Sequence, residues 1–357
     1  MMSCTTDFRV TLYDPLPSPA DVLEDLPLSP ELAATVGRTR AEVRAVLDGT
    51  DDRLLVVAGP CSVHDPVAAL EYARRLAGTG LGEDLLIVMR SYFEKPRTVT
   101  GWTGLIHDPG MDGRHDVHRG LRTARGLLLD IVALGVPAGC EWLDPITPRY
   151  LADTVTWGAV GARTAESQVH RQLVSGLPMP AGFKNSTDGD VQVAADACVA
   201  AAAGHTFFGV TPAGAAAVVT TSGNRDTHVI LRGGRAGPNY EVPYIAKALD
   251  LITAAGLPRR LMVDASHGNS GRDHRRQPSI AAAVADQVAA GETGLAGVML
   301  ESFLREGRQE PGPLDALAYG QSVTDACMDF GTTIAVLETL AAAVRGRRRN
   351  VRAGGAG

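Results

Sequence analysis

From residue 54 onward, the sequence alternates between short apolar runs and longer stretches that carry helix signals. The runs are almost continuous and contain many β-branched residues, which is typical of parallel strands buried on both faces. Nine such runs occur: LLVVAG (54–59), LLIVMR (85–90), AGCEWL (138–143), AVGAR (159–163), AGFKN (181–185), TFFGV (206–210), HVILRG (228–233), LMVDASH (261–267) and GVMLES (297–302). This alternation predicts an α/β fold with a parallel sheet.

Helices are predicted between the runs, beginning near residues 66, 118, 148, 166, 190, 241, 279 and 331. Asp65 before Pro66 is typical of a helix start, and Gly256 and Gly291 are typical of helix ends. Eight helices and nine runs favour a closed (β/α)8 TIM barrel. No helix separates the run at 206–210 from the next run, which predicts an inserted β-hairpin. A doubly wound open sheet is the alternative, although no GxGxxG motif follows the first run.

The sequence divides into three parts. Residues 1–50 are first proline-rich and then weakly helical, and we interpret them as an N-terminal arm outside the main core that serves oligomer contacts or regulation. Residues 51–345 are predicted to form the catalytic barrel. Residues 346–357 are basic and glycine-rich, which indicates a flexible tail.

Composition excludes several classes of protein. The 357 residues carry a net charge of −6, which argues against a dedicated nucleic-acid binder. No apolar stretch approaches the length of about 18 residues that a membrane-spanning helix needs. The five cysteines form no CxxC pair, and the N-terminus has no apolar signal segment. Both features predict a cytoplasmic protein in a reducing compartment.

Cationic residues gather at the ends of the predicted strands, where barrels carry their chemistry. Six lie at strand ends or just beyond: Arg90, Lys95, Arg97, Arg163, Lys184 and Arg232. Guanidinium groups match carboxylates and phosphates, so converging cations in a net-acidic chain predict a pocket for a small, multiply charged anion. The simpler alternative for any one of them is an ion pair on the barrel rim.

A second set of residues combines a thiol, an imidazole and carboxylates. Cys61 follows the first run, His267 and Glu301 belong to the last two runs, and Asp325 is a fourth candidate. These side chains become neighbours only if the barrel closes. Together they suit a divalent cation such as Mn, Fe, Co or Zn. Taken singly, Cys61 would be interpreted as a small buried hydrophobic residue and His267 as a core histidine.

Long segments around these residues resemble the class I 3-deoxy-D-arabino-heptulosonate 7-phosphate (DAHP) synthases. The segments follow the family order over most of the chain. They are DDRLLVVAGPCSVHDP (51–66), IVMRSYFEKPRT (87–98), GWTGLIHDP (101–109), EWLDPITPRYLAD (141–153), WGAVGARTAESQVHRQLVSGL (157–177), GFKNSTDG (182–189), ILRGG (230–234), DASHGNS (264–270), VMLES (298–302) and LAYGQSVTDAC (317–327).

The resemblance implies a homo-oligomeric barrel enzyme, a homodimer or homotetramer. Its activity would be the condensation of phosphoenolpyruvate with D-erythrose 4-phosphate, which releases phosphate and opens the shikimate pathway. The resemblance also implies four ligands for the divalent metal: Cys61, His267, Glu301 and Asp325.

The resemblance further implies which residues touch the substrates. The phosphoenolpyruvate pocket would consist of Arg90, Lys95, Arg163, Lys184 and Arg232, with Glu141 beside them. Arg97 and Thr98 would contact the sugar phosphate. Lys95, His267 and Cys61 are assigned to catalysis. We expect Lys95 to assist proton transfer near the metal, with a pKa lowered by burial beside other cations.

Three alternatives stay open at the level of the sequence. The same barrel could condense phosphoenolpyruvate with a different aldose phosphate. It could be a Schiff-base aldolase with Lys184 as the nucleophile. It could also be a barrel that has lost catalysis and serves as a binding subunit, which no sequence feature supports.

Overall fold

The computed structural model describes residues 9–97 and 99–354, and its centre is a closed barrel of parallel strands. The strand order around the barrel is β1-β10-β9-β8-β5-β4-β3-β2. The strands are β1 (Leu54–Gly59), β2 (Leu85–Arg90), β3 (Ala138–Glu141), β4 (Trp157–Val160), β5 (Ala181–Lys184), β8 (Thr227–Leu231), β9 (Leu261–Asp264) and β10 (Leu295–Glu301). The predicted TIM barrel is confirmed, and the open-sheet alternative is wrong.

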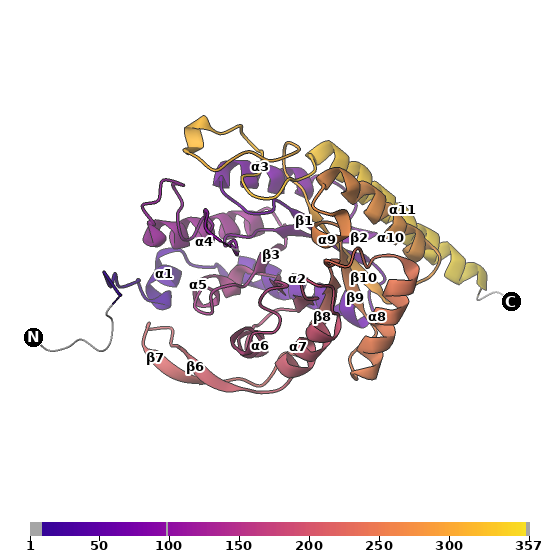
Figure 1. Cartoon of the computed structure of the whole chain (residues 1–357), viewed down its shortest axis with the longest axis horizontal. Coiled ribbons are helices and arrows are strands. Elements are labelled where there is room, and N and C mark those ends of the chain that lie inside the picture. Colours follow the sequence, from indigo (N-terminus) through magenta and orange to yellow (C-terminus); the bar gives the residue numbers. More distant parts are fainter. Residues whose placement is uncertain (1–8, 98, 355–357) are drawn as a thin grey trace, which may run out of the picture.

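Helices surround the barrel, as Figure 1 shows. The main ones are α3 (Pro66–Ala77), α4 (Val117–Ala133), α5 (Pro148–Leu151), α6 (Gln168–Ser175), α7 (Gln192–Ala202), α8 (Val242–Ala254), α10 (Gln277–Ala289) and α11 (Phe330–Gly354). Shorter turns are η1 (Ala152–Thr154), α9 (His267–Ser270), η2 (His274–Arg276) and η3 (Leu314–Ala316). The residues predicted to begin and end helices do so. The Asp65 side chain accepts from backbone N–H groups in the first turn of α3, and Gly256 after α8 has a φ of 73°.

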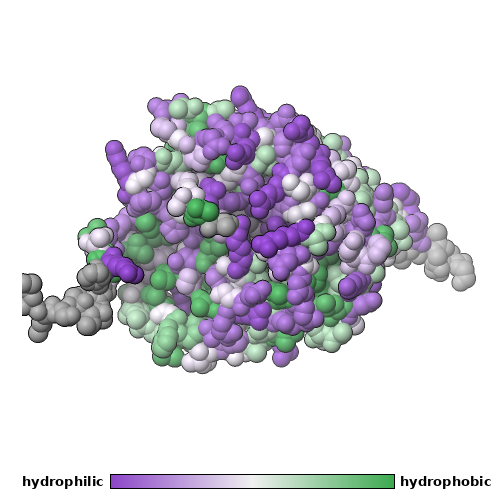
Figure 2. Space-filling view, viewed as in Figure 1, coloured by the Kyte–Doolittle hydropathy of each residue, from purple (hydrophilic) through white to green (hydrophobic). Residues whose placement is uncertain are grey.

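The inserted hairpin is also confirmed. It consists of β6 (Thr206–Val210) and β7 (Ala216–Thr220), which pair antiparallel outside the barrel. In Figure 1 it lies along the lower left edge, away from the strand ends. Figure 2 shows hydrophobic side chains toward this edge, whereas hydrophilic side chains gather near the middle of the same face. Phe208 on β6 is 93% exposed.

The N-terminal segment contains α1 (Pro19–Asp25) and α2 (Pro30–Asp48). Val43 and Val46 of α2 are buried in one cluster with Leu55 and Val57 of β1. The expectation that this segment lies outside the main core is therefore wrong for α2. Hydrophobic burial against the first strand is the physical reason. A role of residues 1–50 in oligomer contacts or regulation stays a prediction.

The C-terminal helix α11 extends further than the sequence predicts. Its backbone is helical as far as Gly354, so residues 346–354 continue the helix, and the flexibility of this segment stays a prediction. Arg348 accounts for part of this order, because its guanidinium pairs with Asp52 at 2.5 Å and with Asp84 at 2.6 Å. Among the described residues, no helix combines the length and apolar character needed to cross a membrane.

One buried histidine makes the stability of the barrel sensitive to pH. His228 on β8 accepts from Trp157 Nε1 at 3.4 Å, and burial lowers the pKa of His228 to about 3. The unfolded chain takes up this proton near pH 6.5, whereas the folded chain does not. The His228 contribution to stability is therefore present above pH 6.5 and is lost as the pH falls toward 3.

We predict that His228→Gln flattens the acid dependence of folding. In urea unfolding at a series of pH values below about 6, the wild-type free energy of unfolding should fall more steeply, by up to about 1.4 kcal/mol per pH unit. Equal slopes for the two proteins would contradict this explanation.

Candidate active site

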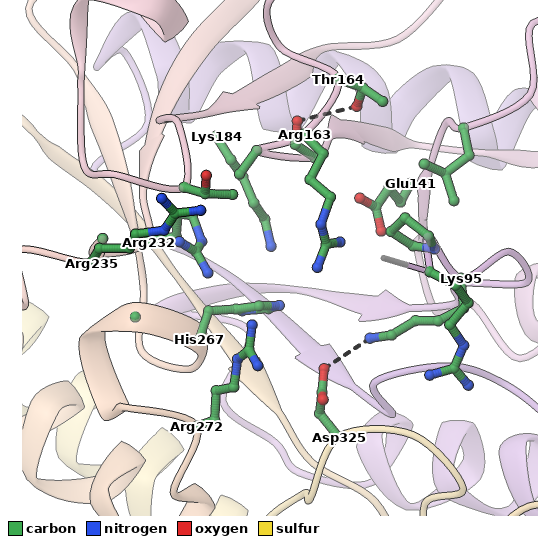
Figure 3. A pocket seen from close by; sticks show the side chains of 18 of the residues that line it. Lys95, Glu141, Arg163, Thr164, Lys184, Arg232, Arg235, His267, Arg272 and Asp325 are labelled. Atoms are coloured by element: carbon green, nitrogen blue, oxygen red, sulfur yellow. Dashed lines mark hydrogen bonds and ion pairs between the residues drawn. The ribbon is translucent and has the colours of Figure 1, made fainter. Parts of the chain in front are cut away.

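A cavity of about 850 Å³ opens at the carboxyl ends of the strands. Most of the residues singled out from the sequence line it: Arg90, Lys95, Arg97, Glu141, Arg163, Lys184, Arg232, His267 and Asp325. Cys61 and Glu301 are buried close by, in contact with Lys95 and Arg90. Thr98 lies outside the described residues. Figure 3 shows that the labelled lysine, arginine and histidine side chains converge on a common space.

Three acidic or thiol groups form a compact cluster at one side of this cavity. One ligand atom from each of Cys61, Glu301 and Asp325 lies within 4.8 Å of the other two. His267 is adjacent, with Nε2 at 3.7 Å from Glu301 Oε1. A sulfur, two carboxylates and an imidazole form a donor set that suits a borderline divalent cation. The residues present therefore fit the metal that the sequence predicts.

Glu301 is held in place by a buried network. Its Oε1 accepts from Arg90 Nη2 at 3.0 Å, and its Oε2 accepts from Ser266 Oγ at 2.7 Å. Burial opposes the charge of Glu301, but His267 and Arg90 lower its pKa overall. The Arg90 guanidinium also donates to the carbonyls of Pro60 and Cys61. Arg90 is thus partly neutralised before any ligand arrives.

Lys95 lies between the thiol and a carboxylate of the cluster. Its Nζ is 2.7 Å from Cys61 Sγ and 2.9 Å from Asp325 Oδ2. Burial favours the neutral amine, but Cys61, Asp325 and Glu301 outweigh it and raise the pKa of Lys95. The expected lowering of this pKa is therefore wrong. The sequence suggested cationic neighbours, whereas the nearest groups are potential anions.

The Cys61 thiol is fully buried, and burial together with the Glu301 charge raises its pKa to about 12. A bare thiol in this position keeps its proton at neutral pH. Metal binding at Cys61 must therefore release that proton, because the thiolate is the ligand form.

Three arginines that line the cavity have no carboxylate partner in the part of the chain that the structure describes. Within the described residues, no carboxylate oxygen lies within 4.0 Å of the guanidinium nitrogens of Arg163, Arg232 or Arg272. Burial lowers the pKa of Arg232, and repulsion from Arg272 and Arg163 acts in the same direction. Uncompensated cations around a cavity are favourable only where an anion binds.

The structure adds residues that the sequence did not single out. Arg235 and Arg272 line the cavity, and Asp264 contacts both Lys184 and His267. Only Asp264 had a sequence signal, since it stands in the same apolar run as His267. Arg235 and Arg272 lie in irregular loops beyond the strand ends. The apolar pattern of the strands therefore gives no information about their positions.

Comparison with known proteins agrees with this geometry. A model of the DAHP synthetase I family matches residues 31–338. The chain belongs to this family. A phospho-2-dehydro-3-deoxyheptonate aldolase of Corynebacterium glutamicum is 52% identical over 353 residues, covering 96% of each chain. A Phe-sensitive enzyme of the same name from Escherichia coli is 52% identical over 344 residues, covering 96% of this chain and 98% of the relative.

A solved structure supports the family on the level of the fold. The phospho-2-dehydro-3-deoxyheptonate aldolase of Francisella tularensis is 46% identical, with a TM-score of 0.93 over 95% of this chain and 99% of that chain. As a DAHP synthetase I family member, the chain is an enzyme: a transferase with DAHP synthase activity, the first step of the shikimate pathway.

The buried network predicts different costs for two carboxylate substitutions. Glu301→Gln leaves the fully buried Arg90 charge without its carboxylate, which should lower the free energy of unfolding by about 3–5 kcal/mol. The Asp325 side chain is 41% exposed, so Asp325→Asn should cost about 1 kcal/mol or less. Denaturant unfolding of the metal-free variants measures both. Equal losses in the free energy of unfolding would contradict the prediction that the buried Arg90–Glu301 pair contributes more to stability than the exposed Asp325 carboxylate.

Proposed function

We propose that this cavity binds a divalent metal, phosphoenolpyruvate and D-erythrose 4-phosphate side by side. One observation carries the proposal: a cluster of metal-ligand atoms lies beside a cavity that is lined by arginines without a carboxylate partner among the described residues. The donor cluster is suited to a cation, and these arginines are suited to a multiply charged anion. A DAHP synthase needs both kinds of site next to each other.

The metal would be held by Cys61, His267, Glu301 and Asp325, three of which already cluster within 4.8 Å. Mn, Fe, Co and Zn all accept this mixture of sulfur, nitrogen and oxygen ligands. When bound there, the ion supplies Lewis-acid polarisation of the aldehyde oxygen or of the attacking water.

Phosphoenolpyruvate would lie between the cluster and these arginines. Its carboxylate and phosphate together need several fixed cations, and the chain offers Arg90, Lys95, Arg163, Lys184 and Arg232, with Glu141 at the edge. Clamping both groups fixes the orientation of C3 relative to the aldehyde. The Lys95 ammonium lies beside the proposed metal ligands Cys61 and Asp325, which puts its Nζ protons in reach of an oxygen of the reacting substrates.

The sugar phosphate would bind at Arg97, and Thr98, which lies outside the described residues, stays the second contact predicted from the sequence. The Arg97 side chain lines the cavity and is anchored by donating from Nε to the Trp102 carbonyl at 2.7 Å. In the reaction, C3 of phosphoenolpyruvate forms a bond to the aldehyde carbon, and water adds at C2. Phosphate then leaves C2 with cleavage of the C–O bond, which gives DAHP and inorganic phosphate.

The Schiff-base alternative fits the structure less well. Lys184 is paired with the buried Asp264 carboxylate at 2.9 Å, an arrangement suited to a cation that binds an anion rather than to an amine nucleophile. Condensation with another aldose phosphate differs only at the sugar end of the cavity, and the substrate comparison below separates it.

We also propose a cytoplasmic homodimer or homotetramer with no nucleic-acid or membrane partner. The exposed side chains of Leu12, Phe208 and Val218 support an apolar contact between copies. The cysteines form no CxxC pair, which supports a reducing, cytoplasmic compartment. The negative net charge argues against a nucleic-acid partner.

Phosphate release from phosphoenolpyruvate and D-erythrose 4-phosphate tests the function. Turnover should disappear with EDTA and return with Mn²⁺, because the metal is essential. D-arabinose 5-phosphate should give no more than weak release, and product mass identifies the sugar in each case.

In the same assay, Lys95→Arg should lose turnover at saturating metal while phosphoenolpyruvate still binds.

The contrary outcomes are distinct. Turnover that resists EDTA, together with borohydride trapping of substrate on the chain, would replace this proposal with Schiff-base chemistry. Preferential use of arabinose 5-phosphate would change the second substrate. Full activity of Lys95→Arg would remove Lys95 from proton transfer.

A further inference from the structure

Asp264, the last residue of β9, touches both halves of the cavity through one carboxylate oxygen. Its Oδ2 lies 2.9 Å from Lys184 Nζ and 2.8 Å from His267 Nδ1. Its Oδ1 accepts from the backbone N–H of Ser266 at 2.9 Å. The side chain is completely buried. Both oxygens are therefore engaged, and Oδ2 is shared by two basic groups.

The contact with His267 leaves Nε2 as the ring nitrogen that faces the donor cluster. Nδ1 lies at ion-pair distance from Asp264 without forming an aligned hydrogen bond. Rotation of the ring into alignment would place the proton of a neutral imidazole on Nδ1 and the lone pair on Nε2. That nitrogen is the one near Glu301, at 3.7 Å. The His267 backbone has a φ of 52°, a strained conformation for a residue with a side chain.

The contact with Lys184 fixes the position of an ammonium group that lines the cavity. The Lys184 side chain is only 4% exposed, and burial of an unpaired ammonium is costly. Among the described residues, Asp264 is the one carboxylate within ion-pair distance of Nζ. An ammonium has three hydrogens, so this pairing leaves donors for an incoming anion.

We propose that Asp264 is a positioning residue shared by the metal subsite and the phosphoenolpyruvate subsite. It orients His267 toward the metal and Lys184 toward the anion through the same oxygen. The proposal rests on the function proposed above. It implies that removing one buried carboxylate, which itself touches neither ligand, weakens the binding of both.

Asp264→Asn tests this with two separate equilibria on the full-length, metal-free chain. Co²⁺ alone is titrated and followed by its visible and near-ultraviolet absorption, including the thiolate band. Phosphoenolpyruvate alone is titrated by calorimetry. Because the neutral amide oxygen cannot hold two basic groups as the carboxylate does, Co²⁺ affinity should fall about 10- to 100-fold. Phosphoenolpyruvate affinity should fall about tenfold or more.

Asp84→Asn is the matched control. Asp84 is also buried and paired with two arginines, Arg345 and Arg348, but it precedes β2 at the opposite end of the barrel. This variant should lose stability and keep both affinities. If Asp264→Asn does not fold, Asp264→Glu retains the charge but displaces the oxygens, and both affinities should again fall.

Each remaining result overturns a different statement. Unchanged affinities in a folded Asp264 variant, or a loss confined to one ligand, would overturn the shared role. Equal losses in Asp84→Asn would attribute the effect to general destabilisation and overturn it as well. A wild-type chain that binds neither Co²⁺ nor phosphoenolpyruvate would overturn the proposed function itself.

Discussion

The pairing of β1 with β10 closes the barrel, and the candidate active site depends on it. Gly59 at the end of β1 is in register with Glu301 at the end of β10, and the Ser302 N–H donates to the Gly59 carbonyl at 2.9 Å. This places Cys61 beside Glu301 although the two are distant in sequence. Gly59 also permits a close approach of β2, because a Cβ there would lie 2.5 Å from the Arg90 carbonyl oxygen.

The distribution of charge follows from this closure. Buried carboxylates end β9 and β10, and each is neutralised by a cation from the next strand but one around the barrel. Glu301 pairs with Arg90, and Asp264 pairs with Lys184. Arg163 and Arg232 have no such carboxylate within the described part of the chain and still face the cavity. The site therefore offers ligands to a cation on one side and unpaired cations to an anion on the other.

The sequence predicted the barrel because its signals are local. Apolar runs, proline-led helix starts and glycine helix ends each depend on a few neighbouring residues, and the structure reproduces them. The lining residues at the strand ends were found because charged side chains there have few structural explanations. Their roles, by contrast, came from a family resemblance.

What the sequence could not supply were long-range contacts. The burial of Val43 and Val46 against β1 depends on how α2 folds back over the barrel. The pairing of Arg348 with Asp52 and Asp84 stabilises helical residues that composition alone suggested were flexible. The pKa of Lys95 depends on Cys61 and Asp325, which reach it only after the barrel closes. Asp264 escaped notice because its importance lies in two partners from other elements.

X-ray absorption of the Zn²⁺-loaded protein tests the central claim most directly, namely that barrel closure assembles one metal centre from Cys61, His267, Glu301 and Asp325. The account predicts a single sulfur scatterer at about 2.3 Å with nitrogen and oxygen at about 2.0–2.2 Å, and loss of the sulfur in Cys61→Ser. A shell of nitrogen and oxygen alone in the wild-type protein would contradict it.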